Sequence, residues 1–250
     1  MSNVSGDWGP ESRPYPPPPY YPPPPGYQKP PYDVEHGFRW AWASFRGHPW
    51  PLIGALLFWF VALVLLYSVP FVLVFALGGS DAVIVTLLVL SMLTLLVAIA
   101  AAISAYINGV LKIADGQPVT FATLVRPRRL AAMLGLLLVI ALGAMVGFVL
   151  FVLPGVVIAF LTIFAPFVLL DRNVSIVEAI KVSAELVKDN IGPILLMWLA
   201  GSVIVFVGQL ACFVGLFVAI PVATLFHVYT YRYLSDGWLA APGRVSSGLR

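Results

Sequence analysis

Two patterns alternate along the chain: long apolar runs, and short segments in which apolar and charged residues recur with helical spacing. A helix needs about 20 predominantly apolar residues to cross a bilayer. Six runs approach or exceed this length, and we expect a transmembrane helix in each: 51–77, 83–111, 130–153, 155–170, 193–208 and 211–231. The sequence therefore predicts an all-α membrane protein, with six transmembrane helices in a membrane domain over residues 34–235.

Residues 175–189, between the fourth and fifth runs, predict an amphipathic helix. At 100° per residue, one side is apolar or small and the other is charged. The first side holds Ile176, Ala179, Ile180, Ser183, Leu186 and Val187, and the second holds Glu178, Lys181, Glu185, Lys188 and Asp189. Ser175 followed by Glu178 has the spacing of a capping box. A short amphipathic helix between two spans is expected to lie on the bilayer surface.

Residues 34–48 show the same pattern ahead of the first run, so we expect a second interfacial helix there. Phe38, Ala41, Trp42 and Phe45 share one face, whereas Trp40 lies off it. Asp33 precedes the segment as the expected N-cap. An ungapped match with residues 176–190 indicates an internal repeat of surface helix followed by span.

Proline and glycine divide the apolar sequence into separate helices. Pro154 and Gly155 predict a tight reversal between the third and fourth spans. Pro70, Pro166 and Pro221 lie within predicted spans and are expected to kink them.

The two ends of the chain are predicted to be disordered tails, at residues 1–33 and 236–250. Proline runs at 16–19 and 22–25 are interleaved with tyrosines. Proline lacks a backbone donor and fixes φ, so the N-terminal tail is expected to sample polyproline II. Two interpretations stay open: a docking segment for a protein partner, or a tail without a fixed partner.

The distribution of charge predicts the topology. The 250 residues carry a net charge of +3, and all fourteen Lys and Arg fall on one side of the six-span arrangement. They lie before span one (Arg13, Lys29, Arg39, Arg46), between spans two and three (Lys112, Arg126, Arg128, Arg129), between four and five (Arg172, Lys181, Lys188) and after six (Arg232, Arg244, Arg250). The positive-inside rule then places both termini in the cytoplasm of a multi-pass cell-membrane protein. Because these residues flank spans, we expect no nucleic-acid partner.

The predicted spans contain no Asp, Glu, Lys or Arg, which argues against a proton- or sodium-coupled mechanism. The sequence has no HExxH motif, no glycine-rich phosphate loop and no spaced set of metal ligands. The only cysteine is Cys212, so an intrachain disulfide is excluded. We therefore expect no catalytic residues, no cofactor and no metal.

Membrane lipids are the expected partners of the basic residues. The candidate headgroup contacts are Arg126, Arg128, Arg129, Lys181, Lys188, His227 and Arg232. For His227 the alternative is an interfacial histidine within an aromatic belt. Gly143 and Gly147 have GxxxG spacing, which favours helix packing, either within the chain or at the seam of a homo-oligomer.

The run LPGVVIAFLTIFAPFVLLDRNVSIVEAIKVSAELVKDN, at residues 153–190, resembles a motif of a large bacterial integral-membrane family. This family includes the membrane domain of some glycerophosphodiester phosphodiesterases, and the chain is also similar to actinobacterial proline/tyrosine-tailed membrane proteins of unknown function. The matching residues are Pro154, Gly155, Glu178, Ala179, Ile180, Lys181 and Ser183. Residues 112–124 and 215–234 are similar to the family's middle loop and closing span. The resemblance implies a six-helix membrane domain with no assigned activity, and the phosphodiesterase activity is not expected here.

Two functional hypotheses follow. The first is a non-enzymatic integral membrane protein, a scaffold or accessory factor in envelope or lipid homeostasis. The alternative is a transporter or exporter of small solutes or lipids, with a cavity between kinked helices.

Overall fold

The computed structural model describes residues 31–77, 80–211 and 214–241, and for 75–77 only the backbone. Most of the predicted N-terminal tail, the end of the C-terminal tail and Cys212 lie outside these residues. The described chain is helical, without a strand in these ranges. Its helices are α1 (Val34–Gly47), α2 (Pro49–Leu77), α3 (Asp81–Ala114), α4 (Phe121–Val125), α5 (Leu130–Leu150), α6 (Val152–Leu161), α7 (Ala165–Asp171), α8 (Ile176–Asp189), α9 (Ile191–Leu210) and α10 (Leu216–Leu234).

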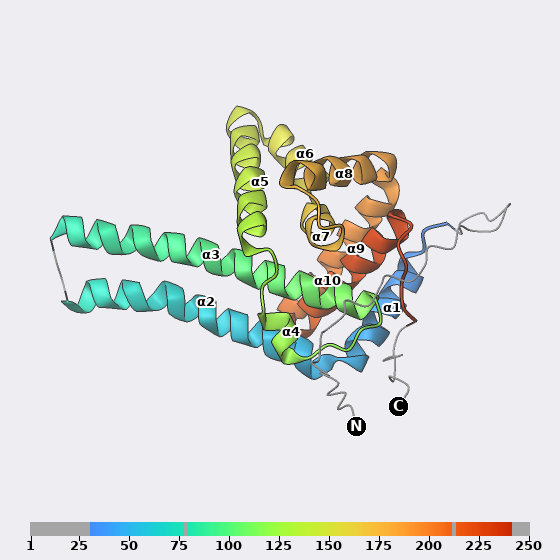
Figure 1. Ribbon diagram of the computed structural model, residues 1–250, viewed down its shortest axis with the longest axis horizontal. Coiled ribbons are helices and arrows are strands. Elements are labelled where there is room, and N and C mark those ends of the chain that lie inside the picture. Colours follow the sequence, from blue (N-terminus) through green and yellow to red (C-terminus); the bar gives the residue numbers. More distant parts are fainter. Residues whose placement is uncertain (1–30, 78–79, 212–213, 242–250) are drawn as a thin grey trace, which may run out of the picture. The chain divides into compact units, whose positions relative to one another are not determined.

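Three antiparallel helix pairs dominate the part of the chain from Tyr32 onward: α2 with α3, α5 with α6, and α9 with α10 (Figure 1). They meet in one buried cluster, which we call the base. The base combines α1, α4, α7, most of α10, the start of α2, residues 100–114 of α3 and buried residues of α5, α8 and α9. The apolar core of the described residues therefore lies where the pairs converge, and not along their full lengths.

The α2–α3 pair extends from the base as an arm with apolar side chains on all sides. Every buried residue of α3 lies at or after Ala100, whereas Leu88, Met92 and Leu93 are exposed. Residues 81–99 span about 28 Å at 1.5 Å per residue, close to the thickness of the bilayer's hydrocarbon core. An exposed apolar surface of this extent requires lipid around it.

Five of the described helical segments are long and apolar enough to cross a membrane: Pro49–Val74, Asp81–Ala114, Leu130–Leu150, Val152–Asp171 and Ile191–Leu210. The chain is thus a multi-pass membrane protein. The sixth predicted span forms α10, which does not belong to this set. Leu225, Phe226, Val228 and Tyr231 of α10 have no exposed surface. Because α10 is largely enclosed by other helices, it can carry polar residues that a lipid-exposed helix would not tolerate.

The fourth predicted span is not one kinked helix, because it breaks between α6 and α7. Pro166 lies in the first turn of α7, where a missing backbone N–H is tolerated. Ser183 of α8 fills the break: its Oγ donates to the Leu161 carbonyl at 2.7 Å and accepts from the Phe164 N–H at 3.2 Å. A polar side chain from a neighbouring helix thus satisfies the backbone groups that the break exposes.

The reversal between α5 and α6 occurs three residues before the predicted Pro-Gly position. Phe151 alone separates the helices, in an extended conformation with φ −168° and ψ 143°. Pro154 and Gly155 lie within the first turns of α6. Gly155 is needed there because a Cβ at this position would lie 2.5 Å from Phe148 Cγ of α5.

The two predicted amphipathic segments form α1 and α8. The buried residues match the predicted apolar face in α8 more closely than in α1. The fully buried residues of α8 are Ala179, Ser183 and Val187, all on the predicted apolar side. In α1 the predicted face is only partly buried: Ala41 and Phe45 are enclosed, whereas Phe38 and Trp42 are 40% and 39% exposed. Trp40, which was placed off this face, is 4% exposed.

Gly37 explains the rotation of α1. A Cβ at this position would lie 2.7 Å from Phe226 Cε2, so only glycine allows α1 to approach α10 this closely. The approach turns Trp40 inward, where its indole N–H donates to the Ala240 carbonyl at 2.9 Å. A hydrogen-bonded indole can be buried, which the apolar pattern alone did not indicate.

Residues at both inner ends of the predicted tails are packed. The Tyr32 hydroxyl lies 2.7 Å from Thr230 Oγ1, and its burial raises its pKa to about 12. The Ala240 N–H donates to the Ala114 carbonyl at 2.8 Å. Disorder was therefore the wrong prediction for Tyr32 and for the residues around Ala240.

Candidate functional site

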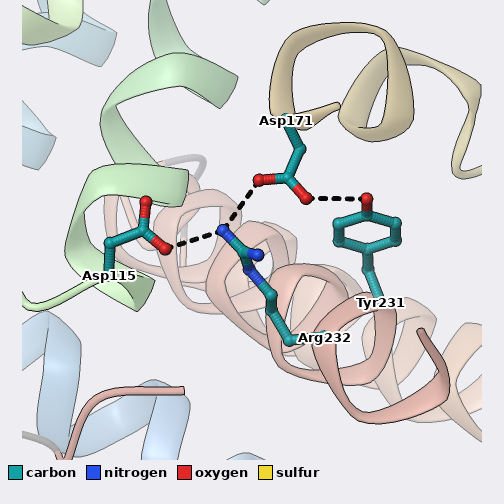
Figure 2. Close-up of polar contacts among 4 residues, drawn as sticks. All are labelled: Asp115, Asp171, Tyr231 and Arg232. Carbon is teal, nitrogen blue, oxygen red and sulfur yellow. Dashed lines mark hydrogen bonds and ion pairs between the residues drawn. The ribbon is translucent and has the colours of Figure 1, made fainter. Parts of the chain in front are cut away.

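Four residues form a polar cluster inside the base: Asp115, Asp171, Tyr231 and Arg232. Figure 2 shows the Arg232 guanidinium between the two carboxylates. Its Nη2 lies 2.7 Å from Asp115 Oδ1 and 2.8 Å from Asp171 Oδ1. The Tyr231 hydroxyl donates to Asp171 Oδ2 at 2.8 Å. Asp171 is thus held by two neighbouring residues of the same helix.

Three helices contribute to this polar cluster. Asp115 is the C-cap of α3, Asp171 is the last residue of α7, and Arg232 lies in the last turn of α10. A carboxylate at a helix C-terminus is disfavoured by the helix dipole, whereas an arginine there is favoured. Arg232 therefore compensates two unfavourably placed carboxylates and links the ends of three helices (Figure 2).

The cluster is largely screened from solvent. The side chains of Arg232, Asp171 and Asp115 are 12%, 18% and 34% exposed. Burial raises the pKa of Asp115, and the charge of Asp171 acts in the same direction, although the Arg232 guanidinium opposes both. Arg232 Nε has no hydrogen-bond partner among the described residues. With two carboxylates and one guanidinium, the arrangement is suited to holding helices together.

Arg129 is also engaged internally. It adopts a left-handed conformation with φ 52° immediately before α5. Its Nη1 donates to the Leu169 carbonyl at 2.7 Å and to the Val174 carbonyl at 2.8 Å. Carbonyls near a helix C-terminus lack intrahelical donors, so Arg129 satisfies them and connects the start of α5 to α7.

The remaining basic candidates face outward. Arg126, Arg128, Lys181 and Lys188 are exposed, and their side chains form no ion pair or hydrogen bond with any described residue. Ser104 holds the backbone of Arg128, accepting from its N–H at 3.0 Å and donating to its carbonyl. The structure therefore separates the seven predicted headgroup contacts: Arg129 and Arg232 have internal partners, whereas these four guanidinium and ammonium groups are free to meet an anion.

His227 lies elsewhere, in a cleft of about 610 Å³ between α9 and α10. Its Nδ1 is 2.6 Å from the Ala223 carbonyl, one turn earlier in the same helix. The cleft is lined by Trp198, Gly201, Ser202, Val203, Val205, Phe206, Gln209, Ala223 and His227. Gly201 opens the space opposite the ring, since a Cβ there would lie 3.3 Å from His227 Cε1.

The GxxxG residues face α6 within the same chain. A Cβ on Gly147 would lie 2.7 Å from the Gly155 backbone nitrogen, whereas one on Gly143 would lie 3.7 Å from Ile158 Cγ2. The close backbone approach is thus at Gly147, and Gly143 makes an ordinary van der Waals contact.

Sequence reasoning missed Asp115, Asp171 and Tyr231. Both carboxylates directly follow or end apolar helices, which was the available signal, but spacing along the chain does not reveal that the ends of α3, α7 and α10 meet. Arg232 was identified only as a flanking positive charge.

Comparison with known proteins gives relatives of unassigned activity. The uncharacterized protein Rv2560 of Mycobacterium tuberculosis and the uncharacterized protein Mb2590 of Mycobacterium bovis are each 43% identical over 131 residues. The match covers 52% of this chain but only 40% of each relative. No protein-family model and no solved structure matches the chain. The likeness to the phosphodiesterase membrane domain finds no support in these comparisons.

Proposed function

We propose that this chain is a non-enzymatic scaffold or accessory protein of the cell membrane, acting in envelope or lipid homeostasis. One observation carries the proposal: a bilayer-length apolar arm extends from a base whose buried charges are paired with one another. Such a base gives a fixed platform at one membrane face. Its outward basic and amphipathic surfaces are then available to lipids and partner proteins.

The proposed topology has six spans, with α10 as the sixth and both termini in the cytoplasm. Residues 81–99 of α3 lie in the hydrocarbon, and residues 100–114 enter the base, which extends from the cytoplasmic leaflet to the cytoplasmic interface. The basic loop at residues 126–129 then lies beside the base on the cytoplasmic side, as the positive-inside rule requires. Because α10 is enclosed by other helices, its lower hydropathy is compatible with spanning.

Helices α1 and α8 are proposed to lie in the cytoplasmic headgroup region. Phe38 and Trp42 on α1 are partly exposed aromatic side chains, a residue class enriched at this depth. Arg126, Arg128, Lys181 and Lys188 would meet anionic headgroups, each contributing about 1 kcal/mol. The N-terminal tail is proposed to bind a protein partner, on the basis of its proline and tyrosine content.

Photo-crosslinking in native membranes tests the scaffold role. A photoreactive amino acid replaces Lys181 or Lys188 on the exposed side of α8, and buried Ala179 provides the matched control. A scaffold gives discrete, reproducible protein adducts from the first two positions and none from the third. Identical patterns at all three positions, or no protein adduct from either lysine, would contradict the role.

The cleft between α9 and α10 supports a second candidate, transport of a lipid or small solute. Pro221 lies within α10, two residues before Ala223 of the cleft lining, and proline can kink a membrane helix. Purified protein in proteoliposomes would then move a lipid or osmolyte faster than protein-free vesicles. Equal flux across a panel of both classes would dismiss this candidate.

A further inference from the structure

The cleft between α9 and α10 contains a polar acceptor that the described chain does not satisfy. His227 Nδ1 lies 2.6 Å from the Ala223 carbonyl, and a carbonyl can only accept a hydrogen bond. The proton of the neutral ring therefore resides on Nδ1. This leaves Nε2 as an acceptor without a partner among the described residues.

The location of this acceptor restricts what can reach it. His227 is seven residues before the end of α10 at Leu234, which corresponds to about 10 Å along the helix. In the proposed topology, this places the ring below the phosphate level of the cytoplasmic leaflet. A charged headgroup would pay a large desolvation cost at this depth, whereas an uncharged hydroxyl that finds an acceptor pays much less.

The other lining residues fit an amphiphile. Trp198, Val203 and Phe206 supply apolar and aromatic surface along α9. Ser202 lies beside them, and its Oγ donates to the Trp198 carbonyl at 2.8 Å, so its oxygen can accept one further hydrogen bond. The cleft lining thus combines hydrogen-bond acceptors with apolar and aromatic side chains.

We propose that this cleft binds a neutral membrane lipid with a free hydroxyl group, of the long-chain alcohol or diacylglycerol class. The hydroxyl donates to His227 Nε2, and the hydrocarbon chain lies along α9 toward Phe206. An unpaired acceptor in hydrocarbon is costly, and this hydrogen bond removes the cost. The inference rests on α9 and α10 spanning the bilayer, as proposed above, but it does not require the scaffold role.

Photolabelling of the full chain in lipid nanodiscs tests the proposal. The probes are a diazirine-bearing hexadecanol and its methyl ether, which has the same chain but no hydroxyl donor. We expect the alcohol to label cleft peptides of α9 and α10 about fivefold more than the ether, the ratio expected for one net hydrogen bond. Equal labelling by both probes would mean acyl-chain contact only and would overturn the proposal.

Three variants test whether His227 causes the preference for the alcohol probe over the ether probe. His227→Phe keeps an aromatic ring but removes the acceptor, so the alcohol should lose its advantage over the ether. Ser202→Trp fills the cleft and should reduce labelling by both probes. Leu199→Trp is the matched control, because Leu199 is exposed on α9 but does not line the cleft. An alcohol preference that survives His227→Phe would contradict the assignment.

A competition experiment on the unmodified protein does not depend on how the variants fold. Excess unlabelled hexadecanol should displace the photoreactive alcohol, whereas excess hexadecyl methyl ether should not. Equal displacement would contradict the proposal. Ether labelling elsewhere on α9 and α10 reports membrane insertion separately: its absence would refute the topology, and its presence without alcohol preference would refute the site alone.

Discussion

Arg232 ties three helices of the base together, because it neutralises carboxylates from two other helices. Its two ion pairs have N–O distances of 2.7 and 2.8 Å, and its side chain is only 12% exposed. In contrast, the Arg39–Glu35 pair on α1 is solvent-exposed. Surface pairs of this kind contribute little to stability, whereas removal of one partner from a buried pair leaves an uncompensated charge.

Loss of the buried Arg232 ion pairs should therefore destabilise the protein more than loss of the exposed Arg39–Glu35 pair. Arg232→Gln should lower the free energy of unfolding by about 3 kcal/mol, because Asp115 and Asp171 then lose the guanidinium that lies between them. Arg39→Gln is the control and should leave the thermal midpoint almost unchanged. Tryptophan-fluorescence melting of the purified protein in detergent measures both. Equal shifts in the two variants would show that the polar cluster does not hold the helices together.

The free energy of unfolding should depend on pH through Asp115. Burial raises the pKa of Asp115 above its ordinary value of 3.8, so the folded protein retains this proton more tightly than the unfolded chain does. The free energy of unfolding should then fall as pH rises from the ordinary pKa through the raised one.

Asp115→Asn removes the titrating group and should flatten this part of the stability curve. Melting temperatures measured between about pH 4 and pH 7 provide the comparison. If the melting temperatures of Asp115→Asn and the unmodified protein changed with pH in parallel, the raised pKa of Asp115 would be contradicted. The same curves for Arg39→Gln should follow the unmodified protein, since its ion pair lies on the surface of α1.

At the level of elements, α8 completes a broken helix. Ser183 bonds the Leu161 carbonyl and the Phe164 N–H across the gap between α6 and α7. Ser183→Ala should cost about 1–3 kcal/mol, because both backbone groups lose their partner in a buried site. Ser91→Ala is the control, since the Ser91 hydroxyl is exposed and bonds only its own helix. Thermal melting distinguishes them, and equal effects would refute the role of α8.

The α5–α6 pair gives a second test at this scale. Gly147→Ala should destabilise by about 1–3 kcal/mol, because the added methyl group would lie 2.7 Å from the Gly155 nitrogen and force the helices apart. Gly143→Ala adds its methyl group at ordinary contact distance from Ile158 and should be nearly neutral. If Gly143→Ala were the more damaging change, α5 would not pack against α6 as described.

Helical periodicity predicted the existence and type of these elements well, but it could not predict which elements meet. The apolar side of α8 follows from spacing alone, because Ala179, Ser183 and Val187 recur every four residues. In α1, periodicity placed Ala41 and Phe45 correctly but missed Trp40, because its hydrogen-bonded N–H and the close contact at Gly37 turn that side chain inward.

The polar cluster was not predictable for a related reason. Asp115 and Arg232 are far apart in the sequence, and only the three-dimensional arrangement brings them within hydrogen-bond distance. The break at Ser183 likewise depends on a contact between α8 and the α6–α7 turn. Local patterns specify helices, whereas the candidate sites arise from packing between helices that no spacing rule connects.

At the level of the whole protein, the central claim is that the chain crosses the membrane six times, with the base at the cytoplasmic face. Five crossings would leave the residues after α10 on the opposite side from the basic loops. The two arrangements differ only in whether the polar but enclosed α10 spans the bilayer. The accessibility of a residue after α10 therefore decides between them.

Labelling of intact cells with a membrane-impermeant maleimide makes this measurement. Native Cys212 lies in the sequence between α9 and α10, and Trp238 follows α10 with 54% of its surface exposed. In six spans, Cys212 is labelled in intact cells, whereas Trp238→Cys in a Cys212→Ser background is labelled only after permeabilisation. Labelling of Trp238→Cys in intact cells would contradict the six-span account.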